Sequence, residues 1–455
     1  MIRSPLMLNV SSDRIATQLD FRPFRAWRYD PKKNAPASVI APPYDVISPA
    51  EQKALYAQSP YNCVRLILNE EEPGDHEQRN RYTRARDFFQ DWQRQGILVR
   101  EPAPAFYFYE QEFRHPITGS AQKRAALLGL LKLEPFEKGI VIGHENTLAG
   151  PKQDRRRLLE STRTNFSAVF GLHEDAEGQI LEAAWKAAKD RPVMEASDEK
   201  GVGHRLWVLK DPRDTEKIRF AMSSRKVYIA DGHHRYQTAL DYARRRRLEE
   251  NPPAGQDQPY DFVLAALVAF QDPGLAVLPT HRILLPYGGW DEVKTLEVLK
   301  KYFELEPAPP AQLKKWVEED MTPESSQNRT RFGFVTSKAS FLLSLRDFKA
   351  VRERMPAGTS ETAARLDVNV LAHFVFADLL NLPSEKWEAQ LRFTRYADEA
   401  LEKVRSGEAA AAFLLWPPKA EVLREMGKTG ELMPQKSTYF YPKLASGLVF
   451  YSHED

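Results

Sequence analysis

The chain has 455 residues, a length that predicts two or three domains. Apolar residues make up 42% and charged residues 28%, as in ordinary soluble globular proteins. The net charge of +2 gives no general attraction to nucleic acid or membrane, and no apolar run approaches the roughly 18 residues of a membrane span. The single cysteine excludes an internal disulfide framework. Since residues 1–7 also lack a secretory signal, these features predict a cytoplasmic protein.

An early loop at residues 42–47 carries two candidate substrate contacts. Ser48 and Glu51 predict a capping box at the start of a helix, so the loop lies directly before that helix. Tyr44 and Asp45 at the tip of the loop are placed to face a ligand, and a purely structural turn is the alternative.

Strand and helix patterns alternate along the first two thirds of the chain. Strands are predicted at residues 39–41, 63–68, 105–113, 125–133, 169–172, 204–209 and 262–270, and helices at residues 76–95 and 179–189. Cys63 lies in one of these strand patterns and is interpreted as a small core residue.

A polar loop over residues 143–157 follows the second long strand. Glu145 is a candidate general base, Lys152 a candidate phosphate contact and His144 a candidate substrate contact. The alternative is a solvated, charged loop that leads into a helix.

The densest group of polar residues lies at a turn between an apolar strand pattern and a helix pattern. Asp231, Gly232, His233, His234 and Arg235 follow one another there. Free backbone N–H groups and the positive end of the helix dipole suit an anion at such a turn. The glycine allows close approach of a ligand, and the guanidinium can hold a phosphate with two parallel hydrogen bonds. We therefore predict a phosphate-binding turn.

Other interpretations of this turn are a simple helix cap with two surface histidines, or a metal site. The carboxylate of Asp231 can cap the helix or contact a hydroxyl or a metal ion. Adjacent helical residues diverge by about 100°, so His233 and His234 are not expected to chelate one ion together. No metal site is predicted within the protein itself.

Two later segments add candidate residues. His281 and Arg282 follow the strand pattern at residues 275–278 and are candidate phosphate contacts, because ligands bind at strand ends in open α/β sheets. In the tail, Lys436 and Lys443 accompany three aromatic residues. The tail either binds an anion or a ring, or forms a strand that docks on the first domain, and both interpretations stay open.

These patterns predict an α/β fold with mixed sheets. Residues 1–289 are expected to form an N-terminal α/β domain that carries the turn, and residues 290–455 a C-terminal α+β domain whose tail docks back. In the second domain, helices are predicted at residues 290–303, 368–380 and 397–405, and strands within 332–345 and at 411–416.

The sequence resembles the bacterial domain-of-unknown-function 1015 family over nearly its whole length. The matching stretches are residues 41–47, 144–147 with Lys152, Asp154 and Arg155, 230–240, 278–282 and 435–442. A local similarity ties residues 231–235 to the ParB/sulfiredoxin-like group, which includes ParB-type CTP hydrolases and free-serine kinases. The resemblance implies a nucleotide-binding core of that type. Sulfiredoxin chemistry is not expected, because Cys63 lies in a strand pattern away from the turn.

The resemblance implies a nucleotide-dependent phosphotransferase acting on a small hydroxylated metabolite, such as a serine-like amino acid. ATP or ADP, with Mg²⁺, is the expected cofactor, and Arg235 with the turn amides would hold phosphate. The resemblance carries over only to Asp231, Gly232, His233 and Arg235, whereas Glu145 is our candidate for the base from its own loop. His233 or His234 would stabilise developing charge. The alternatives are a non-catalytic nucleotide-binding regulator and a ParB-type hydrolase associated with DNA. The near-zero net charge disfavours the latter.

One geometric expectation follows from these assignments. Residues 144–152, the turn at residues 231–235 and residues 281–282 should line one cleft, since each follows a strand pattern.

Overall fold

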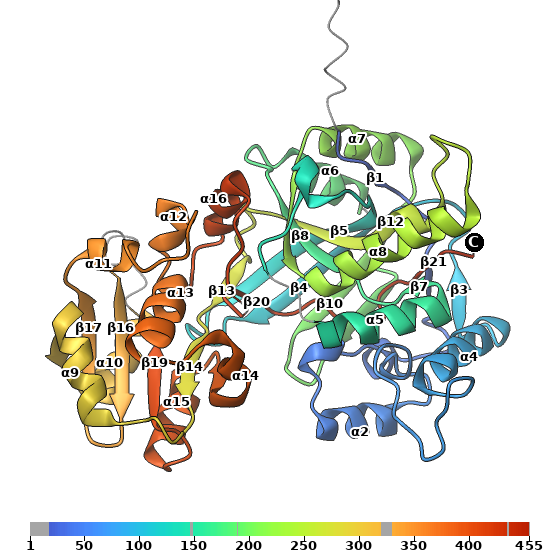
Figure 1. The fold of residues 1–455 in the computed structure, drawn as a ribbon. Helices are drawn as coiled ribbons and strands as arrows, with labels where there is room; N and C mark the ends of the chain where they lie inside the picture. The colour runs from blue at the N-terminus through green and yellow to red at the C-terminus, as the bar shows by residue number, and fades with distance from the viewer. Residues whose placement is uncertain (1–17, 146–148, 189, 320–329, 435, 455) are drawn as a thin grey trace, which may run out of the picture.

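The computed structural model describes residues 18–145, 149–188, 190–319, 330–434 and 436–454. It has a mixed α/β fold with two main sheets and confirms the predicted fold class (Figure 1). Asn146, Thr147 and Gln435, which belong to the motifs of the resemblance, lie outside the described residues. Within the described part of the chain, no helix has both the length and the apolar character needed to cross a bilayer.

The larger sheet combines parallel and antiparallel pairs. Its strands in spatial order are β6 (Val141–Ile142), β11 (Val227–Asp231), β8 (Val169–His173), β12 (Phe262–Ala269), β5 (Ala121–Lys132), β4 (Phe106–Arg114), β10 (Gly203–Leu209) and β9 (Met194–Ser197), and β1 (Phe21–Arg22) pairs with β5. Strands β6 and β11 are parallel, as are β8 and β12, and the remaining neighbours are antiparallel.

Alternate residues of the central strands pack into two different cores, as the twofold repeat of a strand requires. In β4, Phe106 and Phe108 face a core shared with helices, whereas Tyr107 and Tyr109 face the opposite core. The helices of the first core are α6 (Gln179–Ala187), α7 (Pro212–Ser223) and α8 (His233–Glu250). The C-terminal tail covers much of the opposite face.

A third core lies beside the larger sheet and is built mainly from the N-terminal segment. Its elements are β2 (Trp27–Tyr29), α1 (Pro36–Val39), α2 (Pro49–Gln58), α3 (Val64–Ile67), α4 (Arg81–Arg94), β3 (Leu98–Arg100) and part of α5 (Ala149–Thr162). The capping box of Ser48 and Glu51 is present at the start of α2, as predicted.

Two predicted strands in this region are wrong. Residues 64–67 form helix α3, because Asn62 accepts a hydrogen bond from the Val64 amide at 2.9 Å and the one-turn helix buries Val64, Leu66 and Ile67. A short apolar run cannot distinguish a buried strand from a buried helix. Val39 ends the one-turn helix α1, Ile40 follows it in an extended conformation, and Ala41 forms an isolated bridge to Ser446.

The second sheet is antiparallel throughout and forms the other lobe, at the left of Figure 1. Its order is β15 (Phe303–Pro307), β17 (Ser340–Leu345), β16 (Arg331–Thr336), β19 (Ala411–Leu414), β14 (His281–Leu284) and β18 (Leu391–Thr394). Helices α9 (Glu292–Tyr302), α10 (Pro310–Glu319), α15 (Ala397–Arg405), α11 (Phe348–Arg352), α12 (Glu361–Ala364), α13 (Asp367–Asn369), a π-helix (Val370–Leu379) and α14 (Trp387–Gln390) accompany it. The two-domain division at residue 289 stays a prediction.

After α16 (Glu421–Thr429), the chain returns to the larger sheet. Strand β20 (Tyr439–Tyr441) pairs with β13 (Ala276–Leu278), and β21 (Tyr451–Ser452) pairs with β7 (Thr164–Asn165). Phe440 and Phe450 are fully buried in different cores, so apolar burial holds the tail along its length. This return places the tail beside the turn that follows β11.

Candidate functional site

The turn between β11 and α8 has the strand-to-helix geometry that the sequence predicts. Gly232 adopts a φ of +93°, in the left-handed region, and α8 begins at His233. A Cβ atom at position 232 would lie 3.0 Å from the guanidinium of Arg235. The glycine therefore serves two purposes, since it permits the turn and leaves room for Arg235 to fold back over it.

Asp231 carries two ion pairs at the centre of the site. Its Oδ2 accepts from Nη2 of Arg235 at 2.7 Å, and its Oδ1 accepts from Nζ of Lys443 at 2.5 Å. Burial acts to raise the pKa of Asp231, but Lys443 and Arg235 outweigh burial and hold this pKa well below its ordinary value. The carboxylate is therefore ionised at neutral pH, and each of its oxygens contacts a cation.

Arg235 also donates to the carbonyl of Ala168 through Nη1. Its two bonds use two of the five N–H donors of a guanidinium, so further donors remain for an anion. In the described residues, no group of three or more His, Cys, Asp or Glu side chains is arranged to hold a metal ion.

Glu145 faces the turn from the segment after β6, where the backbone is held by a bridge to Met433. Its Oε2 lies 3.8 Å from Nδ1 of His233. Burial raises the pKa of Glu145 to about 7; Lys436 and Lys443 oppose the rise, and the negative charges of Asp231 and Asp45 add to it. A carboxylate with a pKa near neutrality can both accept and release a proton at physiological pH.

His144 and His233 form a buried pair of imidazoles next to Glu145. The rings meet edge to face at a centroid distance of 4.5 Å. Burial lowers the pKa of His144 to about 4 and lowers the pKa of His233 well below its ordinary value, so both rings are neutral at pH 7. The backbone N–H of His144 donates to Nε2 of His233 at 3.2 Å. His233 consequently carries its proton on Nδ1, which is the atom that faces Glu145.

The loop with Tyr44 and Asp45 forms a 3₁₀ turn (Tyr44–Val46) on another side of the site. The guanidinium of Arg155 stacks 3.7 Å from the centre of the Tyr44 ring. The exposed Asp45 is close enough to the turn for its charge to act on His234, whose pKa is lowered by burial first and then by Lys436. Lys152 also acts on His234, which places Lys152 near the turn.

His281 and Arg282 lie in β14 of the second sheet. His281 is fully buried, and its Nδ1 accepts from the Leu415 amide at 3.1 Å within that sheet. Burial lowers the pKa of His281 to about 3 and that of Arg282 to about 10. Nη2 of Arg282 contacts the carbonyl of Lys436 at 3.5 Å, which connects this pair of residues with the site. The structure thus brings together the loop, Glu145 and the turn, while His281 is directed into the second lobe.

The tail supplies site residues that the sequence left undecided. Lys443 reaches Asp231, and its ammonium also lies 4.4 Å from the centre of the Tyr439 ring. Thr438 contacts Nε2 of His144 at 3.2 Å. The sequence signal was the group of two lysines and three aromatic residues at 436–443, but only the docking of β20 shows that these residues face the turn.

A buried arginine holds the tail backbone at this point. Arg124 of β5 donates to the carbonyls of Tyr441 and Pro442, and Gln111 of β4 donates to the carbonyl of Lys443 at 3.0 Å. Because Arg124 is 1% exposed and belongs to the central sheet, the sheet holds the backbone that carries Lys443.

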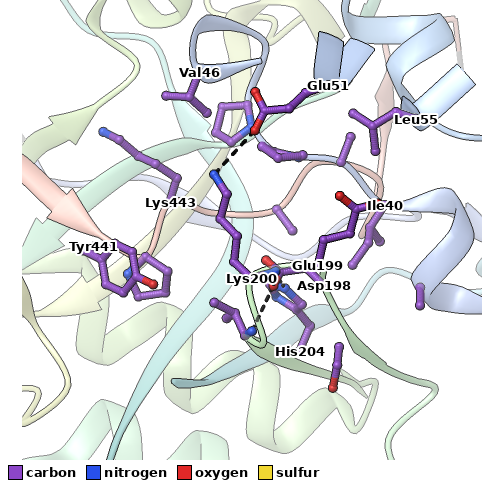
Figure 2. A pocket seen from close by; sticks show the side chains of 18 of the residues that line it. Ile40, Val46, Glu51, Leu55, Asp198, Glu199, Lys200, His204, Tyr441 and Lys443 are labelled. Carbon is purple, nitrogen blue, oxygen red and sulfur yellow. Dashed lines mark hydrogen bonds and ion pairs between the residues drawn. The ribbon is translucent and has the colours of Figure 1, made fainter. Parts of the chain in front are cut away.

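A cleft of about 220 Å³ adjoins the site on the far side of Lys443, and we call it the Tyr441 cleft. Figure 2 shows Lys200 reaching toward Glu51 across this cleft, with Asp198 and His204 beside it. Its lining residues are Ala37, Ile40, Ala41, Pro42, Pro43, Val46, Glu51, Leu55, Gln58, Ser197, Asp198, Glu199, Lys200, Val202, His204, Tyr439, Tyr441, Pro442, Lys443 and Ala445. Most of this surface is apolar.

Comparisons with known proteins place the chain in a family. The model of the family described as "Protein of unknown function (DUF1015)" matches residues 21–369. Free serine kinase in complex with AMP matches with 14% identity and a TM-score of 0.31, over 69% of this chain and 86% of that chain. A conserved hypothetical protein from Pyrococcus furiosus matches with 14% identity and a TM-score of 0.33, over 72% of this chain and 96% of that chain. C-terminally truncated SbnI from Staphylococcus aureus matches with 8% identity and a TM-score of 0.33, over 71% of this chain and 86% of that chain. No curated protein matches.

Proposed function

This chain belongs to the DUF1015 family, and we propose that it is a nucleotide-dependent phosphotransferase acting on a small hydroxylated metabolite. The proposal rests on one observation above all: Glu145, with its pKa near 7, lies beside a glycine turn that gathers two cations around Asp231. A proton acceptor next to a group of phosphate-binding donors is what phosphoryl transfer to a hydroxyl requires.

The donors for phosphate are Arg235, Lys443 and the first backbone amides of α8. A lysine ammonium has three N–H donors, and one of them serves Asp231, so Lys443 can bind a phosphate oxygen without leaving its partner. The positive end of the α8 dipole acts in the same direction. Asp231 orients both cations in this arrangement. Its two oxygens already contact cations, so the residues present do not fit a protein-held Mg²⁺ at Asp231.

In the proposed reaction the acceptor hydroxyl oxygen forms a bond to the terminal phosphorus of the nucleotide. The bond from that phosphorus to the bridging oxygen breaks, and the shortened nucleotide leaves with the bonding electrons. Glu145 takes the hydroxyl proton, and Nδ1 of His233 lies 3.8 Å from the carboxylate oxygen Oε2. Asp45 is the second candidate for the base, because its carboxylate is exposed and near the same turn. A serine-like amino acid is the acceptor class we propose.

The test is a transfer assay with ATP or ADP and a panel of small hydroxylated amino acids and related alcohols. Transfer of phosphate to one of them, dependent on the acceptor, is the expected result. Binding of nucleotide without any transfer across the panel would contradict the kinase assignment.

The ion pairs of Asp231 also favour a second candidate, a nucleotide-binding regulator. The Asp231 carboxylate links Arg235 of α8 with Lys443 of the tail. A bound phosphate that draws either cation away would therefore shift the tail relative to the turn. A regulator would bind nucleotide and alter the protection of residues 436–443 from hydrogen exchange, without turnover for any acceptor.

A further inference from the structure

The Tyr441 cleft has walls suited to a flat, uncharged group. Pro42 and Pro43 come from the loop before α2, and Tyr439 and Tyr441 from the tail. Aromatic rings and rigid proline rings offer flat surfaces at little cost in conformational entropy. A planar heterocycle is therefore a kind of group that these walls can cover.

The cleft meets the phosphate-binding group at one residue. Lys443 lines the cleft and donates to Asp231 at 2.5 Å, and Tyr439 lines the cleft beside it. A ligand with an uncharged ring at one end and phosphates at the other can thus occupy the cleft and the turn together.

The charged residues of the cleft disfavour the opposite orientation of the ligand, in which the phosphates would lie in the cleft and the ring at the turn. Glu51, Asp198 and Glu199 line the cleft together with Lys200, and Lys443 lines it where it meets the turn. The pair of Lys200 and Glu51 spans 3.8 Å between side chains that are 59% and 40% exposed, so it is weak and can open (Figure 2). Three carboxylates repel a phosphate chain, so we expect the phosphates to bind at the turn.

We propose that the Tyr441 cleft binds the base and ribose of the nucleotide whose phosphates lie at the turn. This assignment rests on the proposed nucleotide-dependent function. The acceptor is placed elsewhere because its hydroxyl must reach Glu145, which does not line the cleft.

The test measures whether nucleotide shields the rim of the cleft from a thiol reagent. The natural Cys63 is fully buried, so the unmodified chain provides a silent background. Glu199→Cys places a thiol on the exposed rim, and Ala57→Cys places one on an exposed position of α2 that does not line the cleft. The probes are ADP, inorganic tripolyphosphate and serine, and calorimetry measures ADP binding to each variant.

Saturating ADP should slow alkylation at position 199 at least tenfold, whereas tripolyphosphate should leave the rate within twofold. Neither probe should change the rate at position 57. If ADP binds to the Glu199→Cys variant by calorimetry but gives no protection, the cleft does not hold the base and the inference is overturned. Protection by serine and not by ADP would instead assign the cleft to the acceptor. Absence of ADP binding to the unmodified chain would overturn the proposed function itself, which is a distinguishable result.

Discussion

Glu145 is the residue on which the proposed chemistry depends. Its carboxylate lies in a mostly buried position, with His233 on one side and the charges of Asp231, Asp45, Lys436 and Lys443 around it. Burial disfavours the charged form, and this effect exceeds the influence of the two lysines. The result is a group that changes its protonation state near physiological pH.

Replacing Glu145 by glutamine should separate binding from transfer. Glu145→Gln keeps the shape of the side chain but removes its basicity, so nucleotide affinity should be retained while transfer falls by about 10²-fold or more. The measurement is calorimetry for binding and single-turnover transfer for chemistry. Asp45→Asn is the matched control and should reduce transfer less. If Asp45→Asn reduced transfer more than Glu145→Gln does, the role of base would belong to Asp45.

The pH dependence of stability should report the same group. The folded-state pKa of Glu145, about 7, lies above the ordinary value of 4.5, so the folded chain binds more protons than the unfolded chain between these values. The contribution of Glu145 to the free energy of unfolding is therefore full below pH 4.5 and is lost as the pH rises through 7. Unfolding by urea at pH 5 and pH 8 should show that Glu145→Gln gains about 2 kcal/mol relative to the natural chain at the higher pH.

The transfer rate should rise with pH, whereas the contribution of Glu145 to stability falls with pH, because only the ionised carboxylate accepts a proton. Activity should rise with pH around 7 in the natural chain, and that step should be absent in Glu145→Gln. An equal pH dependence in both proteins would show that another group is titrating.

At the scale of elements, the turn between β11 and α8 constrains the local sequence in two ways. Gly232 has a positive φ, and the guanidinium of Arg235 occupies the space beside it. The turn itself fulfils the prediction of a strand-to-helix junction, but the carboxylate partner of Arg235 within the same turn was not anticipated.

Gly232→Ala should be more costly than the same change at a comparable helix start. At Gly178, the N-cap of α6, φ is +67° and no atom lies within 4 Å of an added Cβ, so Gly178→Ala should cost only the backbone strain of about 1 kcal/mol. Gly232→Ala adds a clash with Arg235 and should cost about 2–3 kcal/mol in urea unfolding, with at least tenfold weaker binding of tripolyphosphate. Equal costs at the two positions would show that Arg235 moves aside freely.

For the whole molecule, the decisive feature is the return of the tail to the larger sheet. The family model ends at residue 369, yet Lys443 completes the ion pairs at Asp231 and Arg124 fixes the backbone that carries it. Segments more than 200 residues apart in the chain therefore form one site.

A double-mutant cycle should measure this long-range pair. Lys443→Met leaves Asp231 with Arg235 alone and should lower the free energy of unfolding by about 2 kcal/mol, whereas the double variant with Asp231→Asn should be destabilised by less than the sum of the single changes. Lys436→Met, at an exposed position, is the control and should change stability by less than about 0.5 kcal/mol. Additive effects would indicate that the pair contributes nothing in solution.

Local chemistry in the sequence predicted the mixed α/β class, the capping box at Ser48 and the turn at residues 231–235, because each depends on neighbouring residues. It misassigned residues 63–68, since a short run with three buried apolar residues does not distinguish a strand from a helix. Only the tertiary structure decided that His281 points into the second lobe and that Lys443 points to Asp231. The reason is that strand pairing across hundreds of residues, here β20 with β13 and β14 with β18 and β19, leaves no trace in local spacing.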